Sequence, residues 1–303
     1  MSHKKPMTLL VGDNPFHGIS HLSQERSRAR NRRIDSADYA AELIKISSEN
    51  GANGFMFTVS ETTLSILKTL RESGTIRSFE LYAIVPYAYE YVRMATQTGG
   101  VSGLAKKIGK QIALSGNIRA ILMGLKGIAF TDLEAILKTY ITFEVSRIKS
   151  TAGKNMRLGS ILLHEVITEM ALAFDLDWLF KGYVDFVIKM GMNPGFETRN
   201  FAYLVHKFKE WHIDFRDCVI ATPFNKAGFQ MNPSQAECEE ALGSIADSKV
   251  IAMSVLAAGY IKPVDAFEYL RSLTNIAGVV VGVSKESQAR ETFRLIRQAY
   301  STR

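Results

Sequence analysis

Residues that can transfer protons or bind a polar substrate gather near the amino terminus. Asp13, Asn14, His17 and His21 follow a short apolar run at residues 7–11. Carboxylates and imidazoles act as general acids and bases, and amides orient polar groups. We expect Asp13 to be catalytic and the other three to bind substrate; an Asx-type turn that only ends a strand is the alternative. We predict no metal site, because a glycine interrupts the segment between the two histidines.

Further polar residues follow later apolar runs. His164 and Glu165 come directly after one run, and we expect His164 to be catalytic and Glu165 to bind substrate. Lys189 ends the run at residues 184–188, shortly before Asn193, a further candidate substrate ligand. A lysine at a buried strand end loses solvation, which lowers its pKa and favours Schiff-base chemistry. The alternative is a lysine held in an ion pair.

Two loop residues are candidates for contact with a substrate. Tyr87 follows the run at residues 81–85, and Asn225 follows the run at residues 218–221. Aromatic side chains at such positions usually line a binding site, and a few polar groups fix the orientation of the ligand. We therefore expect both residues to bind substrate.

The last apolar run ends in a glycine turn that opens a helix. Gly282, Ser284, Lys285 and Arg290 lie in this segment. Backbone N–H groups at the start of a helix, a hydroxyl and two cations favour a phosphate group. We expect an anion to bind here; an ordinary helix capped by a serine is the alternative.

Short apolar runs recur along the chain, and most of them precede a segment with helical periodicity. The eight runs are residues 7–11, 54–58, 81–85, 160–163, 184–188, 218–221, 250–253 and 278–281. Continuous apolar runs fit parallel strands that are buried on both faces. Eight alternating strand and helix units predict a (β/α)₈ or TIM barrel. A doubly wound open sheet is the alternative. The Gly-x-Gly-x-x-Gly turn that often accompanies such a sheet follows none of these runs.

We expect one domain over residues 1–303, since the chain is slightly longer than eight such units need. The surplus predicts a helical insertion between the third and fourth strands, at about residues 89–159. Two or three helices fit there, for example at residues 102–113 and 132–148. Because the active sites of such barrels lie at the carboxyl ends of the strands, the polar residues should meet there.

Composition narrows the class of protein. Apolar residues make up 47% and charged residues 22%, which excludes a disordered chain. No apolar stretch approaches the ~20 residues that span a bilayer, so we expect no membrane partner. Two cysteines and the absence of a secretory signal predict a reduced, cytoplasmic protein.

The positive charge of the chain is concentrated in one segment, and it fits an anionic small-molecule partner. The net charge is +7, and five arginines lie between residues 26 and 33. No nucleic-acid-binding motif accompanies this cluster, so a solvated basic loop or an anionic substrate is the better interpretation. Homo-oligomer formation is left open.

Parts of the chain resemble the aldo-keto reductases. Residues 251–259 resemble the seventh-strand segment of that family, and residues 280–292 resemble its eighth strand and the helix that grips the adenosine phosphate of the cofactor. Residues 51–58 match the approach to the catalytic Asp of the family, and residues 161–164 match the strand that ends in its catalytic His.

The resemblance implies a barrel that reduces a small carbonyl compound with NADP, held by Gly282, Ser284, Lys285 and Arg290. The family's tetrad of Asp, Tyr, Lys and His is mostly absent, because Thr58 stands at the position of the Asp. Of the tetrad, only the His, at residue 164, remains. Two other functions therefore stay open. One is a lyase or aldolase that forms a Schiff base between Lys189 and a phosphorylated carbonyl compound, and the other is a non-catalytic ligand-binding barrel.

Overall fold

Eight parallel strands close into a barrel. The computed structural model describes residues 7–17, 36–76, 78–86 and 133–301. The strands are β1 (Thr8–Gly12), β2 (Gly54–Thr58), β3 (Phe79–Val85), β4 (Met156–Leu163), β5 (Asn193–Glu197), β6 (Val219–Pro223), β7 (Lys249–Met253) and β8 (Ile276–Gly282). They follow one another in sequence order around the barrel, and β8 pairs with β1 in register Val280 to Leu10. The predicted TIM barrel is confirmed, and the open sheet is excluded.

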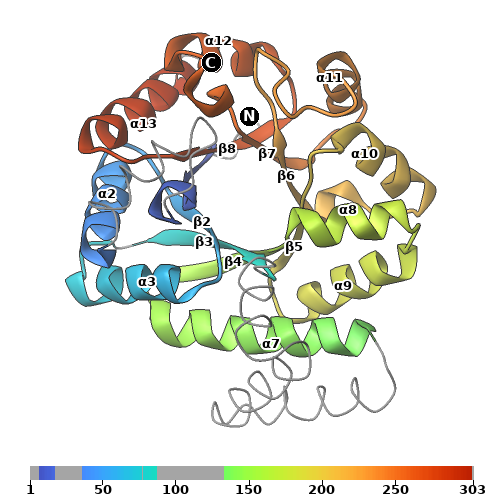
Figure 1. The fold of residues 1–303 in the computed structure, drawn as a ribbon, viewed down its shortest axis with the longest axis horizontal. Coiled ribbons are helices and arrows are strands. Elements are labelled where there is room, and N and C mark those ends of the chain that lie inside the picture. Colours follow the sequence, from blue (N-terminus) through green and yellow to red (C-terminus); the bar gives the residue numbers. More distant parts are fainter. Residues whose placement is uncertain (1–6, 18–35, 77, 87–132, 302–303) are drawn as a thin grey trace, which may run out of the picture.

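Helices form an outer ring around the strands (Figure 1). They are α2 (Ala37–Glu49), α3 (Glu61–Ser73), α7 (Leu133–Ala152), α8 (Glu165–Ala173), α9 (Asp177–Lys189), α10 (Phe201–Glu210), α11 (Gln235–Gly243), α12 (Pro263–Ser272) and α13 (Glu286–Ser301). Three short 3₁₀ helices are η1 (Asn14–His17), η2 (Phe215–Asp217) and η3 (Ala257–Gly259). None of the helices in the described ranges has the length and apolar character that a membrane crossing requires.

The helix predicted at residues 132–148 is a regular part of the barrel. It corresponds to α7, which connects β3 to β4 and packs against α3, β4 and α9. The other predicted helix of the insertion, at residues 102–113, lies outside the described residues.

The strand predicted at residues 184–188 is wrong. This run lies inside α9, where buried residues recur at helical spacing, among them Leu179, Phe180, Tyr183 and Val187. One face of an amphipathic helix therefore supplied the apolar run. The fifth strand is β5, whose residues Pro194 and Gly195 carry little strand propensity.

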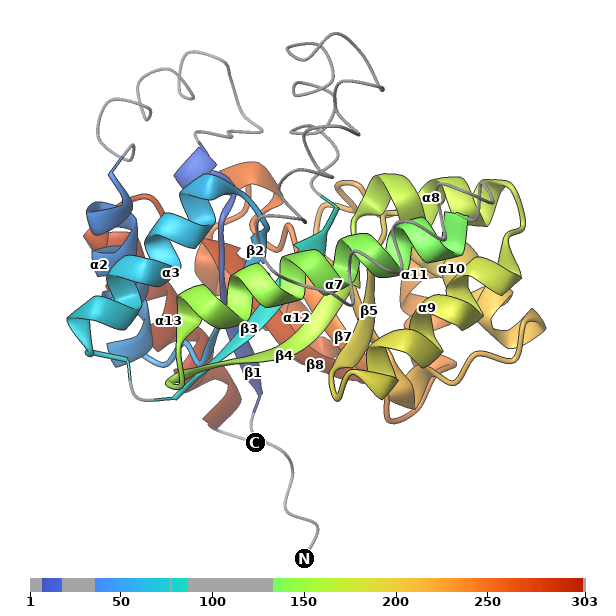
Figure 2. The ribbon, with the colours of Figure 1, turned by 90° about the horizontal axis from the view of Figure 1, so that it is seen from below.

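Side chains fill the barrel in layers. Leu10, Met56, Leu162 and Ile251 belong to one buried cluster inside the barrel. Because side chains alternate along a strand, the residues two positions further along also face inward, at the carboxyl ends of the strands. In this article that end is the mouth. Figure 2 shows the barrel from the side, with the carboxyl end of α13 at the opposite end from the mouth.

Candidate active site

Asp13 joins the ends of two neighbouring strands at the mouth. It is buried, with 5% of its surface exposed. One carboxylate oxygen, Oδ2, accepts hydrogen bonds from the Thr58 backbone N–H at 2.7 Å and from the Thr58 hydroxyl at 2.6 Å. The same oxygen lies 3.1 Å from Nε2 of His17, at the end of η1. Three partners on one oxygen give Asp13 a clear structural role, since it ties β1 to β2.

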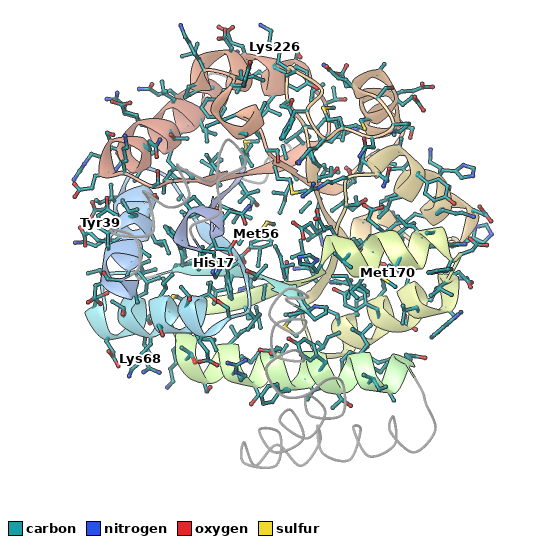
Figure 3. All side chains as sticks on the ribbon, in the orientation of Figure 1. His17, Tyr39, Met56, Lys68, Met170 and Lys226 are labelled. Carbon is teal, nitrogen blue, oxygen red and sulfur yellow. The ribbon has the colours of Figure 1, made fainter. Side chains whose placement is uncertain are left out.

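His17 extends this cluster toward the barrel axis. Figure 3 shows its side chain near the centre of the ring of helices, in the same part of the view as Met56 from the barrel interior. Its Nε2 also lies 3.5 Å from the Thr58 hydroxyl. The structure therefore brings two of the predicted residues, Asp13 and His17, to the mouth together with Thr58.

His164 lies directly after β4 and begins α8. Its ring nitrogen Nδ1 accepts a hydrogen bond from the backbone N–H of Val166 at 3.2 Å, so the side chain caps the helix. A neutral ring whose Nδ1 is an acceptor carries its proton on Nε2. Burial is the main reason why the pKa of His164 is lowered, and the Arg199 charge lowers it further. At neutral pH His164 is thus an uncharged hydrogen-bond donor at the mouth.

Glu197 ends β5, and it was not predicted. It lies two residues after the inward-facing Gly195, so its carboxyl faces the barrel axis at the mouth. Burial, followed by the negative charge of Glu165, raises the pKa of Glu197 to about 7. Its oxygen Oε2 accepts a hydrogen bond from the backbone N–H of Glu165 at 3.2 Å. Glu197 therefore exchanges its proton near neutral pH, as a general acid or base must.

The negative charge of Asp13 links these residues. It raises the pKa of both His164 and Glu197, so the three side chains lie within electrostatic reach of one another. Glu165, the residue after His164, is next to Arg199: Oε2 of the glutamate is 2.7 Å from Nε of the arginine. Among the described residues, the mouth thus holds the carboxyl groups of Asp13, Glu165 and Glu197, the imidazoles of His17 and His164, and the guanidinium of Arg199.

The segment that carries Glu197 and Arg199 is fixed by α8. One oxygen of Glu169, on α8, accepts hydrogen bonds from the Thr198 hydroxyl at 2.7 Å and from the Arg199 backbone N–H at 2.9 Å. Its second oxygen accepts one from the Asn200 side chain at 2.7 Å. Three bonds to one carboxylate hold the connection between β5 and α10 in place.

Lys189 and Asn193 lie at the opposite end of the barrel from the mouth. Lys189 is the last residue of α9 and is exposed to solvent, and Asn193 is the first residue of β5. The Asn193 amide donates to the Gly159 carbonyl at 3.0 Å and accepts from Lys249 at 2.9 Å. The expectation that Lys189 is desolvated at a strand end is wrong, because that strand is a helix, and neither residue can join the site at the mouth.

The remaining predicted substrate ligands differ in their placement. Asn14 is exposed at the start of η1. Asn225 lies after β6 but is fully buried, and its side chain both donates to and accepts from the backbone of Phe229 at 2.8 Å. That amide stabilises its own loop, so its polar atoms are already engaged. His21 and Tyr87, like the arginine cluster at residues 26–33, lie outside the described residues.

The predicted anion site lies between β8 and α13. Ser284 uses both its backbone N–H and its hydroxyl to bond Oε1 of Gln288, at 3.0 and 3.1 Å. Lys285 is exposed, and Arg290 is exposed and lies 3.8 Å from Glu286. A side chain at Gly282 would collide with Pro15, whose ring atoms lie 2.8 Å from the position of a Cβ. Lys285 at this turn and Arg290 within α13 are therefore the two exposed cations of the segment, whereas the serine is engaged in capping.

The residues that sequence reasoning missed are Glu197, Arg199 and Glu169. A signal for them existed. The polar run at residues 197–200 comes directly before a segment with helical periodicity, as the polar residues after the second and fourth apolar runs also do. The described residues contain no group of three or more His, Cys, Asp and Glu side chains arranged to hold a metal ion.

Comparison with known proteins supports the fold. No protein-family model and no curated protein matches the chain. A crystal structure from Pseudomonas aeruginosa, described as "the putative aldo-keto reductase", shares 12% identity with a TM-score of 0.59, over 98% of this chain and 96% of that chain. A second structure with a similar description shares 11% identity with a TM-score of 0.58, over 98% and 95%. The predicted resemblance to aldo-keto reductases is thus confirmed as a likeness of the whole fold.

Proposed function

We propose that this protein is an oxidoreductase that reduces a small carbonyl compound with a nicotinamide cofactor. The observation that carries the proposal is the carboxyl of Glu197, which has a pKa of about 7 and is hydrogen-bonded to the residue after His164. The likeness of the fold to aldo-keto reductases is the second support.

A reduction of this kind needs a proton for the carbonyl oxygen. When bound, a nicotinamide supplies the two electrons and the hydrogen that go to the carbonyl carbon, and the protein supplies the proton. Glu197 is about half protonated near pH 7, so it can donate that proton under neutral conditions. His164, neutral and with its proton on Nε2, can polarise the same oxygen by a hydrogen bond. These two residues would do the work of the absent Tyr and Lys.

The start of α13 fits a phosphate of the cofactor. Lys285 and Arg290 are exposed cations there, and the amino-terminal end of a helix attracts negative charge. These two side chains would hold the phosphate that distinguishes NADP from NAD. Ser284 contributes to the shape of the turn, since its donors already bond Gln288.

Cofactor binding tests the proposal first. NADPH should quench the fluorescence of the two tryptophans as it binds. The Lys285→Ala/Arg290→Ala variant should bind NADPH about tenfold more weakly, because exposed charges each contribute about 1 kcal/mol or less, and its affinity for NADH should not change. Lys226→Ala is the control, since this exposed lysine follows β6.

Activity tests the acid. In a screen of small aldehydes and ketones with NADPH, Glu197→Gln and His164→Ala should each lose at least about a hundredfold in kcat, the usual contribution of a positioned acid. No binding of NADPH at millimolar concentration would overturn the proposal and favour a ligand-binding barrel. Turnover of a carbonyl compound without a nicotinamide would overturn it in favour of a lyase or isomerase.

A further inference from the structure

The ion pair between Glu165 and Arg199 leaves hydrogen-bonding capacity unused. Nε of the arginine and Oε2 of the glutamate are 2.7 Å apart, yet the two atoms are not aligned for a hydrogen bond, and both are buried. Buried polar atoms normally have an aligned partner, because leaving them without one costs free energy. The side chain of Arg199 is 36% exposed overall, so solvent, or a ligand, reaches part of this side chain.

Arg199 is linked to the residues that would move the proton. Its charge lowers the pKa of both His164 and Glu197, which places the guanidinium within electrostatic reach of both. Its ion-pair partner Glu165 is bonded through its backbone to Glu197. A group bound by Arg199 would therefore lie close to a carbonyl that is served by Glu197.

The backbone of Arg199 is held on both sides. Its N–H donates to Glu169 at 2.9 Å, and its carbonyl accepts from the N–H of Asn232 at 3.1 Å. An arginine that is fixed in this way loses less conformational entropy when it binds a ligand than a mobile surface arginine does.

We propose that Arg199 binds the carboxylate of a small 2-oxo acid, and that this makes the site selective for acidic over neutral carbonyl compounds. The planar fork of a guanidinium matches a carboxylate, which it can bind through two parallel hydrogen bonds. A carboxylate attached directly to the carbonyl carbon suits this arrangement, because Glu165 pairs with Arg199 through its side chain and bonds Glu197 through its backbone. This inference rests on the proposed function, whose reaction it makes specific.

Substitutions of the two members of the ion pair should have opposite effects on the affinity for a carboxylate. Oxamate is the probe, because it is an unreactive carboxylate with the shape of a small 2-oxo acid. Arg199→Gln should weaken oxamate binding about 10- to 100-fold, the usual effect of losing a hydrogen bond to a charged group. Glu165→Gln should strengthen it, because the guanidinium is then no longer neutralised. If the ion pair only stabilises the loop, both substitutions should weaken oxamate binding.

Arg216→Gln is the matched control, since Arg216 is exposed in η2, before β6, and pairs with Asp214. Its oxamate affinity should equal that of the unmodified protein. Weaker binding in both Glu165→Gln and Arg199→Gln, or tighter binding of inorganic phosphate than of oxamate, would overturn the assignment.

Turnover separates this inference from the proposed function. With NADPH, pyruvate should be preferred over its neutral amide, and Arg199→Gln should remove the preference mainly by raising KM for pyruvate. Equal rates for acid and amide in the unmodified protein would overturn the inference and leave the reductase intact. Oxamate binding in the expected pattern, with no carbonyl reduced, would overturn the reductase and leave the carboxylate site intact.

Discussion

Replacing Glu197 with glutamine should change how the stability of the protein depends on pH. The pKa of Glu197 is about 7 in the folded protein, against 4.5 for an unperturbed glutamate. Below pH 4.5 the group is protonated in the folded and the unfolded chain, so it has no effect. Between pH 4.5 and 7 the unfolded chain releases the proton and the folded chain keeps it. The free energy of unfolding of the unmodified protein therefore falls as the pH rises through this window.

The size of the effect follows from the two pKa values. Each pH unit between them is worth about 1.4 kcal/mol, so the fully ionised carboxylate destabilises the fold by about 3 kcal/mol. Solvent reaches the partly buried side chain and reduces this destabilisation. The expected loss in the free energy of unfolding is therefore about 2–3 kcal/mol. Glutamine carries no charge, and its amide oxygen can still accept the hydrogen bond from Glu165.

Urea unfolding at several pH values between 5 and 8 measures this difference. The free energy of unfolding of Glu197→Gln, minus that of the unmodified protein, should rise by about 2–3 kcal/mol across the series. Glu240→Gln, at an exposed position on α11, should give no comparable rise. A difference for Glu197→Gln that stays constant from pH 5 to 8 would refute the reasoning, because it would mean that Glu197 titrates alike in both states.

Three further substitutions test the site and its support. Asp13→Asn should lower the free energy of unfolding by about 2–3 kcal/mol in urea, because it weakens the charged acceptor that joins β1 to β2; a loss below 0.5 kcal/mol would contradict that role. Glu169→Gln should accelerate amide hydrogen exchange in the connection between β5 and α10, and unchanged exchange there would argue against the clamp. Lys189→Ala should leave kcat/KM within about twofold of the unmodified value, since Lys189 lies outside the mouth, whereas His164→Ala should not; equal losses would restore the Schiff-base hypothesis.

The barrel was predictable because its strands are buried on both faces. The run at residues 54–58 coincides with β2 at both ends, and the other correctly predicted strands differ from the observed ones by at most four residues at an end. The exception is β5, in which Gly195 is required by space: a Cβ there would lie 2.7 Å from Leu162 and 2.9 Å from the Val219 carbonyl. A strand chosen for close approach carries few of the residues that signal a strand.

The unusual sequence of β5 also explains why Glu197 and Arg199 at the mouth were not predicted. The sequence places Asp13 and His164 at the mouth, because each lies within two residues of the end of a correctly predicted run. Glu197 ends β5 and Arg199 follows it, whereas a fifth strand at residues 184–188 predicts Lys189 at the mouth in their place. Their pairing with Glu165 and Glu169 depends on the position of α8 in the barrel, and a single sequence gives no signal for contacts of that kind.

The three bonds that Glu169 makes to the connection between β5 and α10 have a mechanical consequence. They couple α8 to the connection between β5 and α10, so that Glu197, Arg199 and His164 should keep a constant spacing while a reactant enters and leaves. Entry of a substrate into the barrel must then depend on other parts of the mouth. Substitutions that aim to change the substrate range should therefore succeed more readily in those parts than in α8 or the connection between β5 and α10.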